Sequence, residues 1–443
     1  MVKTAEPTTA AIVLGREQTV LGALRSLCLA GIPAYVACPP GDLVRRSRWY
    51  RPIPGAAGWD GRPSPDARDT LTASLLERAV LIPCNDAAAL WVSEIPRGLL
   101  RDRFLVSSSS PETLQILKDK SRFGQFLAGT TIPHPRTFTI RSAADISALP
   151  FEDLDRVFVK PADSQAFLRV MGVKGLWARD RSEFEAIWKR LEGQNLAVIA
   201  QEYVPGGADD HYFIDGFRDR HGDLTALFAR RRLRISPPDF GSSSYCVSVP
   251  MRDVDAALPG LIQLLERLAY RGIFSAEFKR DARDGAFRVL EVNARAWWYV
   301  EFATRCGVNV IEMAWRDALD MPVTPASSSY AVGEGCVNLR NDLDTVFARH
   351  GAARTPLSLA LRQWSRGHFN VFRFDDPLPG LQVAWQVFIG ALTRRLRHWV
   401  TGDRRARVRK LVRKDQLAKC PVPVQADTEG GTGSSPDLPT SPE

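Results

Sequence analysis

The chain has 443 residues, 45% of them hydrophobic, so it is long enough for two or three domains with separate cores, and an intrinsically disordered polymer is excluded. Its formal net charge is +9, and much of the excess lies late, in residues 394–397 and 404–414. No run of 18 apolar residues is present, and Met1–Thr9 is polar. We therefore expect neither a membrane-spanning helix nor a signal peptide.

The first hundred residues alternate between strand and helix patterns. Ala10–Leu14 predicts a short buried strand, Val20–Ala30 a helix and Ile32–Cys38 a second strand. This order predicts a parallel, right-handed crossover unit. Ala79–Pro83 and Ala87–Val92 add another strand and helix, which makes a Rossmann-like α/β layer.

A second unit begins near Pro111, where a helix is expected to run through Lys120 to Phe126. The patterns that follow predict a strand, a helix with Phe184, Ile187, Trp188 and Leu191 on one face, another strand and a long helix. Their ranges are Arg156–Lys160, Ser182–Leu191, Ala197–Tyr203 and Asp253–Ala269.

A predicted hairpin carries the most informative residues. Ile273–Lys279 and Phe287–Asn293 have strand character, and the Asp284-Gly285 step between them is typical of a hairpin turn. Centring the turn near Asp284 puts Glu277 directly across from Glu291. Because side chains alternate along a strand, Glu291 and Asn293 share a face.

Two opposed carboxylates destabilise a ladder unless a cation lies between them. The oxygens of Glu277, Glu291 and Asn293 are ligands that Mg²⁺ accepts, usually together with substrate phosphates. The alternative is a pair of solvated glutamates on a surface hairpin.

Phosphates need positive charge, which Lys120 and Lys160 supply upstream of the hairpin. Lys160 ends an apolar strand and precedes Pro161, so we expect a fixed position for it. The alternative is a solvated lysine, and for Lys118 and Lys174 this alternative fits at least as well as phosphate binding.

Arginines in two places could stabilise a transferring phosphoryl group. Arg295 follows the metal-binding strand, and the run 230–234, with Arg232 and Arg234, opens a Ser-rich stretch, 236–244, which we expect to be irregular. The alternative for this run is a set of solvated side chains.

Cysteines give no sign of a metal site. They are scattered singly, with no CxxC pair, which indicates a reducing, cytoplasmic location. A cysteine nucleophile lacks support, because Cys28, Cys84 and Cys246 have no neighbouring histidine in the sequence. The seven are Cys28, Cys38, Cys84, Cys246, Cys306, Cys336 and Cys420.

Five segments, in this order and spacing, resemble the ATP-grasp superfamily: Asp119-Lys120, Phe158-Val159-Lys160-Pro161, Gln201-Glu202-Tyr203-Val204-Pro205-Gly206, Ala276-Glu277-Phe278-Lys279 and Leu290-Glu291-Val292-Asn293-Ala294-Arg295. More narrowly, the chain is similar to the carboxylate–amine ligase branch that includes D-aspartate ligases. That similarity involves Arg25-Ser26-Leu27, Ser47-Arg48-Trp49-Tyr50 and Leu81-Ile82-Pro83-Cys84-Asn85-Asp86. The resemblance covers about residues 10 to 325.

The resemblance implies an α/β and α+β architecture in which a Rossmann-like domain precedes an ATP-grasp fold of two α+β subdomains. We expect the Rossmann-like domain at 1–112, the small subdomain at 113–196, the large subdomain at 197–330, a partly helical, basic C-terminal extension at 331–418 and a disordered tail at 419–443.

The resemblance also implies a ligase that activates a carboxylate with Mg-ATP as an acyl phosphate and joins it to an amine, releasing ADP and phosphate. Lys120 and Lys160, with Lys174 as a further candidate, would contact the phosphates. Glu202, Tyr203 and Val204 would form the adenine hinge, and Asp210 would meet the ribose. Glu277, Glu291 and Asn293 would hold one or two Mg²⁺, or Mn²⁺. Arg295 would steady the acyl phosphate, with Arg232 and Arg234 as further catalytic candidates.

The sequence departs from the family pattern at one place. Many ATP-grasp enzymes have a glycine-rich loop over the phosphates, whereas Ala162–Val173 contains Gly172 as its only glycine. How this loop covers the phosphates is therefore left open.

Other functions remain as alternatives. The same site could serve kinase-like or carboxylating chemistry. A non-catalytic protein could instead bind an anionic membrane or nucleic acid through 381–414, where Leu381–Val400 has an apolar face with a basic end. We expect small-molecule carboxylate and amine substrates and no nucleic acid. The oligomeric state is not readable from the sequence.

Overall fold

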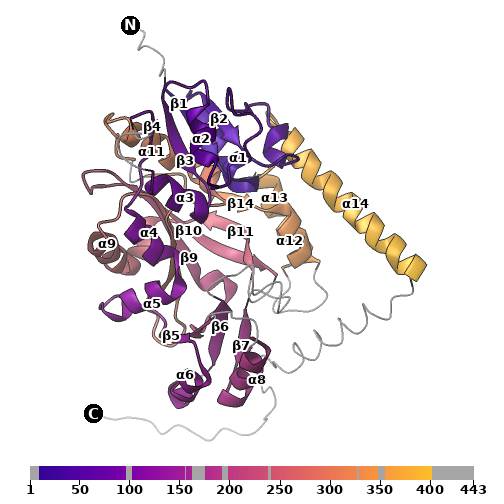
Figure 1. The fold of residues 1–443 in the computed structure, drawn as a ribbon. Coiled ribbons are helices and arrows are strands. Elements are labelled where there is room, and N and C mark those ends of the chain that lie inside the picture. Colours follow the sequence, from indigo (N-terminus) through magenta and orange to yellow (C-terminus); the bar gives the residue numbers. More distant parts are fainter. Residues whose placement is uncertain are drawn as a thin grey trace, which may run out of the picture. The chain divides into compact units, whose positions relative to one another are not determined.

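The structure is a computed structural model that describes residues 9–95, 102–154, 156–161, 175–191, 198–237, 241–326, 329–347 and 355–401. Lys174, the loop 162–173, the basic run 404–414 and the tail 419–443 lie outside the described residues. The chain divides into two compact units, residues 1–385 and residues 386–443. The three sheets below all belong to the first unit, and Figure 1 labels most of their elements.

The first sheet is parallel, with strand order β2-β1-β3-β4. Its central strand β1 is buried along its whole length, as expected for a parallel strand covered on both faces. The expected strands and helices of this layer are confirmed, with ends shifted by a few residues. The elements are β1 (Ala10–Leu14), α1 (Glu17–Leu29), β2 (Ala34–Ala37), η1 (Leu43–Arg46), α2 (Ala67–Thr72), β3 (Ala79–Pro83), α3 (Asp86–Ser93) and β4 (Phe104–Leu105).

Two helices, rather than the single expected one, link this layer to the next. α4 (Pro111–Lys118) stops before Asp119, whose backbone is extended and whose carboxylate accepts hydrogen bonds from the N–H groups of Ser121 and Arg122. Asp119 is thus the N-cap of α5 (Lys120–Ala128). The break makes Lys120 the first residue of a new helix.

The second sheet is antiparallel, with order β5-β8-β6-β7. As expected, helix α8 (Arg181–Leu191) buries Phe184, Trp188 and Leu191, while Ile187 is partly buried. The remaining elements are β5 (Thr137–Ile140), α6 (Ala143–Ser147), η2 (Phe151–Asp153), β6 (Val157–Pro161), β7 (Leu176–Ala178) and β8 (Val198–Glu202).

The third sheet has seven strands in the order β13-β12-β9-β10-β11-β14-β15. The prediction that 236–244 is irregular is wrong at both ends of this stretch. Ser236 ends β10 and pairs with Ser242 at the start of β11. The expected long helix near residue 260 is a 3-10 segment followed by α9, whose first turn contains Pro259. The strands are β9 (His211–Arg218), β10 (Leu224–Ser236), β11 (Ser242–Ser248), β12 (Gly272–Arg280), β13 (Phe287–Asn293), β14 (Gly335–Val337) and β15 (His368–Phe369).

The other elements of the chain are mainly helical. They are η4 (Ala208–Asp210), η5 (Met251–Ala257), α9 (Leu258–Arg267), α10 (Val300–Arg305), α11 (Val310–Ala318), α12 (Leu339–Val346), α13 (Leu357–Arg366) and α14 (Leu378–Thr401). Across the part of the chain that the structure describes, none of the helices combines the length and apolar character needed to cross a bilayer.

Candidate active site

The two glutamates of the hairpin β12–β13 face each other. Glu277 is paired with Glu291, as predicted, and Ser275 with Asn293, whereas the register shifts by one residue between Glu277 and Phe278, on the side of the turn. Directly opposed residues project from the same side of a sheet. On β13, Asn293 Nδ2 donates to Glu291 Oε1 at 3.3 Å, which brings the amide and one carboxylate together.

Glu277 is held as a carboxylate by two neighbours. His211 Nδ1 lies 2.8 Å and Arg232 Nη2 lies 3.0 Å from Glu277 Oε1. Burial acts to raise the pKa of Glu277, but Arg232 and His211 outweigh it and hold the pKa well below the usual range. Burial and Arg232 lower the pKa of His211 to about 4, so this imidazole is neutral at physiological pH.

Lys160 projects from β6 toward the same hairpin. Its Nζ donates to Gln201 Oε1 at 2.7 Å. Burial lowers its pKa to about 8, an effect that Glu291 opposes and Lys120 reinforces. Lys160 is therefore not the solvated surface lysine of the alternative interpretation.

A hollow brings Lys120 and Lys160 to the glutamate and amide of β13. Apolar side chains of α4 and α5 line it together with Glu291 and Asn293. Glu277 is outside the lining, on the neighbouring strand. The polar and charged lining residues are Asp86, Lys118, Lys120, Thr137, Lys160, Gln201, Glu291 and Asn293.

Arg295 connects this hollow to the first sheet. Its Nε donates to Asp86 Oδ1 at 2.8 Å, and its Nη2 donates to Asn293 Oδ1 at 3.2 Å. Asp86 is the first residue of α3, directly after the loop that follows β3. The guanidinium thus lies where the carboxyl end of a parallel strand meets the hairpin, a common position for ligand sites in α/β folds.

Three alternate arginines of β10 are buried, so the alternative interpretation of this run as solvated side chains is wrong for them. Arg230 pairs with Asp215 at 2.7 Å, Arg232 with Glu277, and Arg234 with Asp342 of α12 at 2.6 Å. The structure therefore brings Arg232 to the opposed glutamates. Arg234 is engaged elsewhere, by Asp342 and by Gln363 of α13.

Glu202, the first residue of the expected adenine hinge, ends β8 and already accepts hydrogen bonds from Arg136 and Arg283. Glu202 accepts hydrogen bonds from Arg136 N at 3.1 Å and from Arg283 Nη1 at 2.8 Å. Despite partial burial, these donors lower the pKa of Glu202. Because its carboxylate is occupied, a contact between Glu202 and a base would have to come from its main chain.

Asp210, the residue expected to meet the ribose, also accepts hydrogen bonds from neighbouring groups. It accepts from Gly207 N and from Arg280 Nη2, both at 2.9 Å. Burial opposes ionisation of Asp210, but these donors lower its pKa. Val204 is buried, and Tyr203 packs edge-on against Trp177.

Sequence reasoning missed Lys279, although its motif was recognised. Lys279 is buried on β12, and its Nζ lies 4.9 Å from the centre of the Tyr203 ring. Burial lowers its pKa to about 8, which Asp210 opposes. The signal was present, because Lys279 follows Glu277 by two residues in a strand already assigned to the site. His211 was also missed, and only its position directly after Asp210 could have indicated it.

The carboxylate and amide oxygens around the hairpin could supply only part of the coordination shell of a metal ion. Among the described residues, no group of three or more His, Cys, Asp or Glu side chains is arranged to hold a metal. Two opposed carboxylates and an amide are an incomplete set of oxygen ligands. Mg²⁺ usually completes such a set with water and nucleotide phosphates.

Comparison with known proteins identifies the fold. No protein-family model matches the chain. A D-aspartate ligase of Enterococcus faecium (strain Aus0004) is 25% identical over 252 residues, which is 54% of this chain and 59% of the relative. An L-amino acid ligase from Bacillus licheniformis superposes with a TM-score of 0.52 at 15% identity, over 71% of this chain and 75% of that one. A biotin carboxylase from Campylobacter jejuni gives 0.56 at 15% identity, over 75% of each chain.

The chain has the ATP-grasp fold. The expected order, a Rossmann-like layer followed by ATP-grasp sheets, is confirmed. The chain spans about 59% of the length of the curated relative, so these likenesses show the ATP-grasp architecture and leave activity and substrates to the site.

Proposed function

We propose that this ATP-grasp protein is an ATP-dependent carboxylate–amine ligase. The observation on which the proposal rests is the convergence of Lys160, Glu291 and Asn293 on one hollow, with Glu277 paired directly across the hairpin. Similarity to a D-aspartate ligase favours ligation over other chemistries of this fold.

In the proposed reaction, Lys120 and Lys160 bind the phosphate oxygens of ATP. Glu277, Glu291 and Asn293 would hold one or two Mg²⁺ ions, or Mn²⁺, which neutralise phosphate charge. A carboxylate oxygen of the substrate attacks the γ-phosphorus, ADP leaves, and an acyl phosphate forms. The amine then attacks the acyl carbon, phosphate leaves, and the amine gives up a proton.

Arginines would stabilise the negative charge that develops on the transferring phosphoryl group. Arg295, held between Asp86 and Asn293, is placed to steady the acyl phosphate. Arg232 is the second candidate. We do not extend the proposal to Arg234, because its guanidinium is paired with Asp342.

The adenosine would lie along the hinge. We propose that the main chain of Glu202 to Val204 contacts adenine and that Asp210 meets the ribose. Lys279 beside the Tyr203 ring would add a hydrogen-bond donor to that side of the nucleotide. The hollow is lined by Lys160 and Gln201 of the second sheet and by Glu291 and Asn293 of the third, which supports a nucleotide between these two sheets.

The proposed location is the cytoplasm. The six described cysteines, all outside disulfides and five of them buried, fit a reducing compartment.

Measurement of ADP and phosphate release across paired acids and amines tests the function. We expect turnover that requires both an acid and an amine, and its loss in Glu291→Gln. A control, Glu152→Gln, changes an exposed glutamate outside the site and should leave turnover intact. Turnover that depends on bicarbonate, or phosphate transfer without an amine, would replace this proposal with a carboxylating or kinase-like activity.

A further inference from the structure

The hollow contains one acidic residue that the proposed reaction leaves without a role. Among the described residues that line it, Asp86 and Glu291 are acidic, and Glu291 is a proposed ligand of Mg²⁺. Phosphates and a substrate carboxylate are anions, so the carboxylate of Asp86 repels them. The amine is the one organic reactant with a positive charge near neutral pH, because an alkyl ammonium group, like that of lysine, titrates well above pH 7.

Asp86 is paired, but its partner can be exchanged. Arg295 Nε lies 2.8 Å from Asp86 Oδ1, and Arg295 Nη2 lies 3.4 Å from Asp86 Oδ2. The side chain of Asp86 is 46% exposed, compared with 18% for Arg295, so water and a second ligand can reach the carboxylate. An ion pair that solvent reaches contributes about 1 kcal/mol or less, and its separation therefore costs little.

The two reactants of the second step carry the same two charges as this ion pair. The acyl phosphate is anionic, and the amine arrives as a cation. When Arg295 contacts the acyl phosphate, as proposed above, Asp86 loses its partner, and an ammonium group can replace it. Arg295 Nη2 also donates to Asn293 Oδ1 at 3.2 Å, so an ammonium group at Asp86 would lie next to the acyl group that Arg295 holds.

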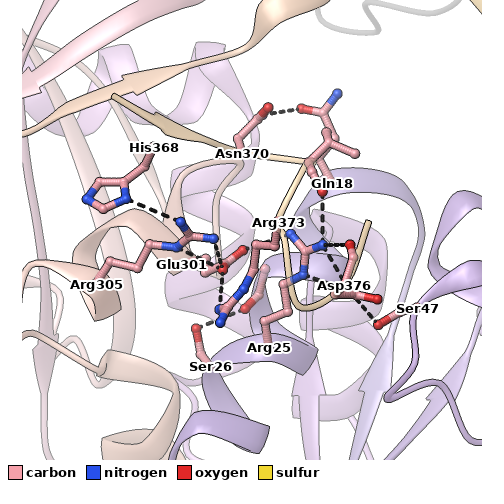
Figure 2. Close-up of polar contacts among 12 residues, drawn as sticks. Gln18, Arg25, Ser26, Ser47, Glu301, Arg305, His368, Asn370, Arg373 and Asp376 are labelled. Atoms are coloured by element: carbon pink, nitrogen blue, oxygen red, sulfur yellow. Dashed lines mark hydrogen bonds and ion pairs between the residues drawn. The ribbon is translucent and has the colours of Figure 1, made fainter. Parts of the chain in front are cut away.

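A buried contact fixes the layer that carries Asp86 to the segment that follows Arg295. Strand β3, which precedes Asp86, pairs with β1, and α1 follows β1. Figure 2 shows Arg25 of α1 beside Glu301 of α10, where Arg25 Nη1 donates to Glu301 Oε2 at 3.2 Å. Because α10 begins shortly after Arg295, this contact holds the two halves of the ion pair at a set separation. Substrates then need to displace only side chains.

We propose that Asp86 binds the ammonium group of the amine substrate and selects amines that are protonated near neutral pH. This inference rests on the proposed ligase function, to which it adds the chemical class of one substrate. Lys118, Lys120 and Lys160 also line the hollow and repel an ammonium group, which leaves Asp86 as its position. The ammonium must lose one proton before its nitrogen attacks the acyl carbon, and the exposed carboxylate gives that proton a path to water.

Hydroxylamine separates the two steps in the full chain, because it is uncharged near neutral pH and attacks acyl phosphates to give hydroxamates. Amino acids of both chiralities and simple dicarboxylic acids are first supplied as the acid, with Mg-ATP and hydroxylamine. Amino acids, ethanolamine and putrescine then replace hydroxylamine as the amine. For an amine that reacts, Asp86→Asn should raise KM about tenfold or more. Hydroxamate formation and the KM for ATP should stay unchanged in this variant.

Two further variants serve as controls. Asp86→Glu keeps the negative charge and should keep most of the affinity for the amine. Asp69→Asn makes the same change at an exposed aspartate in the first turn of α2 and should leave every value unchanged. Because Asp86 is exposed, neither substitution at this position should lower the thermal unfolding temperature.

The possible results separate this inference from the proposed function. An unchanged KM for the amine in Asp86→Asn would overturn the inference alone, as would a wild-type enzyme that accepts hydroxylamine but none of the protonated amines. Loss of hydroxamate formation in Asp86→Asn would also overturn it, because Asp86 would then act through Arg295 on the acyl phosphate. If wild type forms no hydroxamate with any acid, the proposed function fails, and the inference fails with it.

Discussion

Replacing Arg25 with methionine should destabilise the protein strongly. The guanidinium is completely buried, with its Nη1 3.2 Å from Glu301 and its Nη2 2.9 Å from Asp376. It also donates to the main-chain carbonyls of Val371 and Asp376. Methionine fills a similar volume but leaves two buried carboxylates and two carbonyls without this donor.

The magnitude follows from these partners. Removing one member of a buried ion pair costs about 3–5 kcal/mol. Glu301 keeps Arg305 and Arg373, and Asp376 keeps Ser47 and the N–H of Arg48, which favours the lower half of that range. The two carbonyls add about 1 kcal/mol, so we expect a total loss of about 4 kcal/mol.

Urea unfolding followed by far-ultraviolet circular dichroism measures this loss. Arg62→Met removes an exposed arginine paired with Asp60 and should cost less than about 1 kcal/mol. Combining Arg25→Met with Asp376→Asn should cost at least about 1 kcal/mol less than the sum of the single changes, because both alter the same contact. A loss below about 1 kcal/mol for Arg25→Met would refute the reasoning.

Three further predictions concern the proposed nucleotide site. Glu291→Gln should reduce kcat by at least about a hundredfold without lowering the thermal unfolding temperature, because this exposed carboxylate is proposed to bind a metal and contributes little to stability; a lower unfolding temperature in this variant would contradict a role confined to metal binding. ATP affinity should fall as the pH rises through about 8, where Lys160 loses its positive charge, and titration calorimetry in two buffers should detect proton uptake on binding; in Lys160→Gln this pH dependence should weaken and leave the part due to Lys279, whose pKa is also about 8, whereas Lys189→Gln on the exposed side of α8 should keep it in full. Lys279→Met should weaken ATP binding about tenfold, the value of one charge-assisted hydrogen bond, and unchanged binding would remove Lys279 from the site.

Local signals were enough to predict the layers and the hairpin. Ala10–Leu14 and Ala79–Pro83 are continuous apolar runs, as parallel strands require, and both strands have the predicted bounds. The Asp-Gly turn predicted the hairpin, and the pair Glu277–Glu291 also depends on a one-residue register shift between Glu277 and Phe278. These features depend on residues close together in the sequence, which is why one sequence predicts them.

Tertiary contacts explain what was missed. The arginines of β10 look like a solvated run because their partners Asp215, Glu277 and Asp342 are far away in the sequence. The strands β14 and β15 were not predicted either. They lie beyond residue 330, where the sequence pattern is weak, and they join a sheet whose other strands are far away in the sequence. The engagement of Arg234 by Asp342 could not be read from either segment alone.

The separation of Arg25 from Asp376 has a consequence for how the protein is made. The two residues are 351 positions apart, and Asp376 lies close to the last described helix. While the chain is being synthesised, the Arg25 guanidinium on α1 therefore lacks its partner Asp376 until 351 further residues have been added. The Rossmann-like layer can form early, but its final packing is a late event.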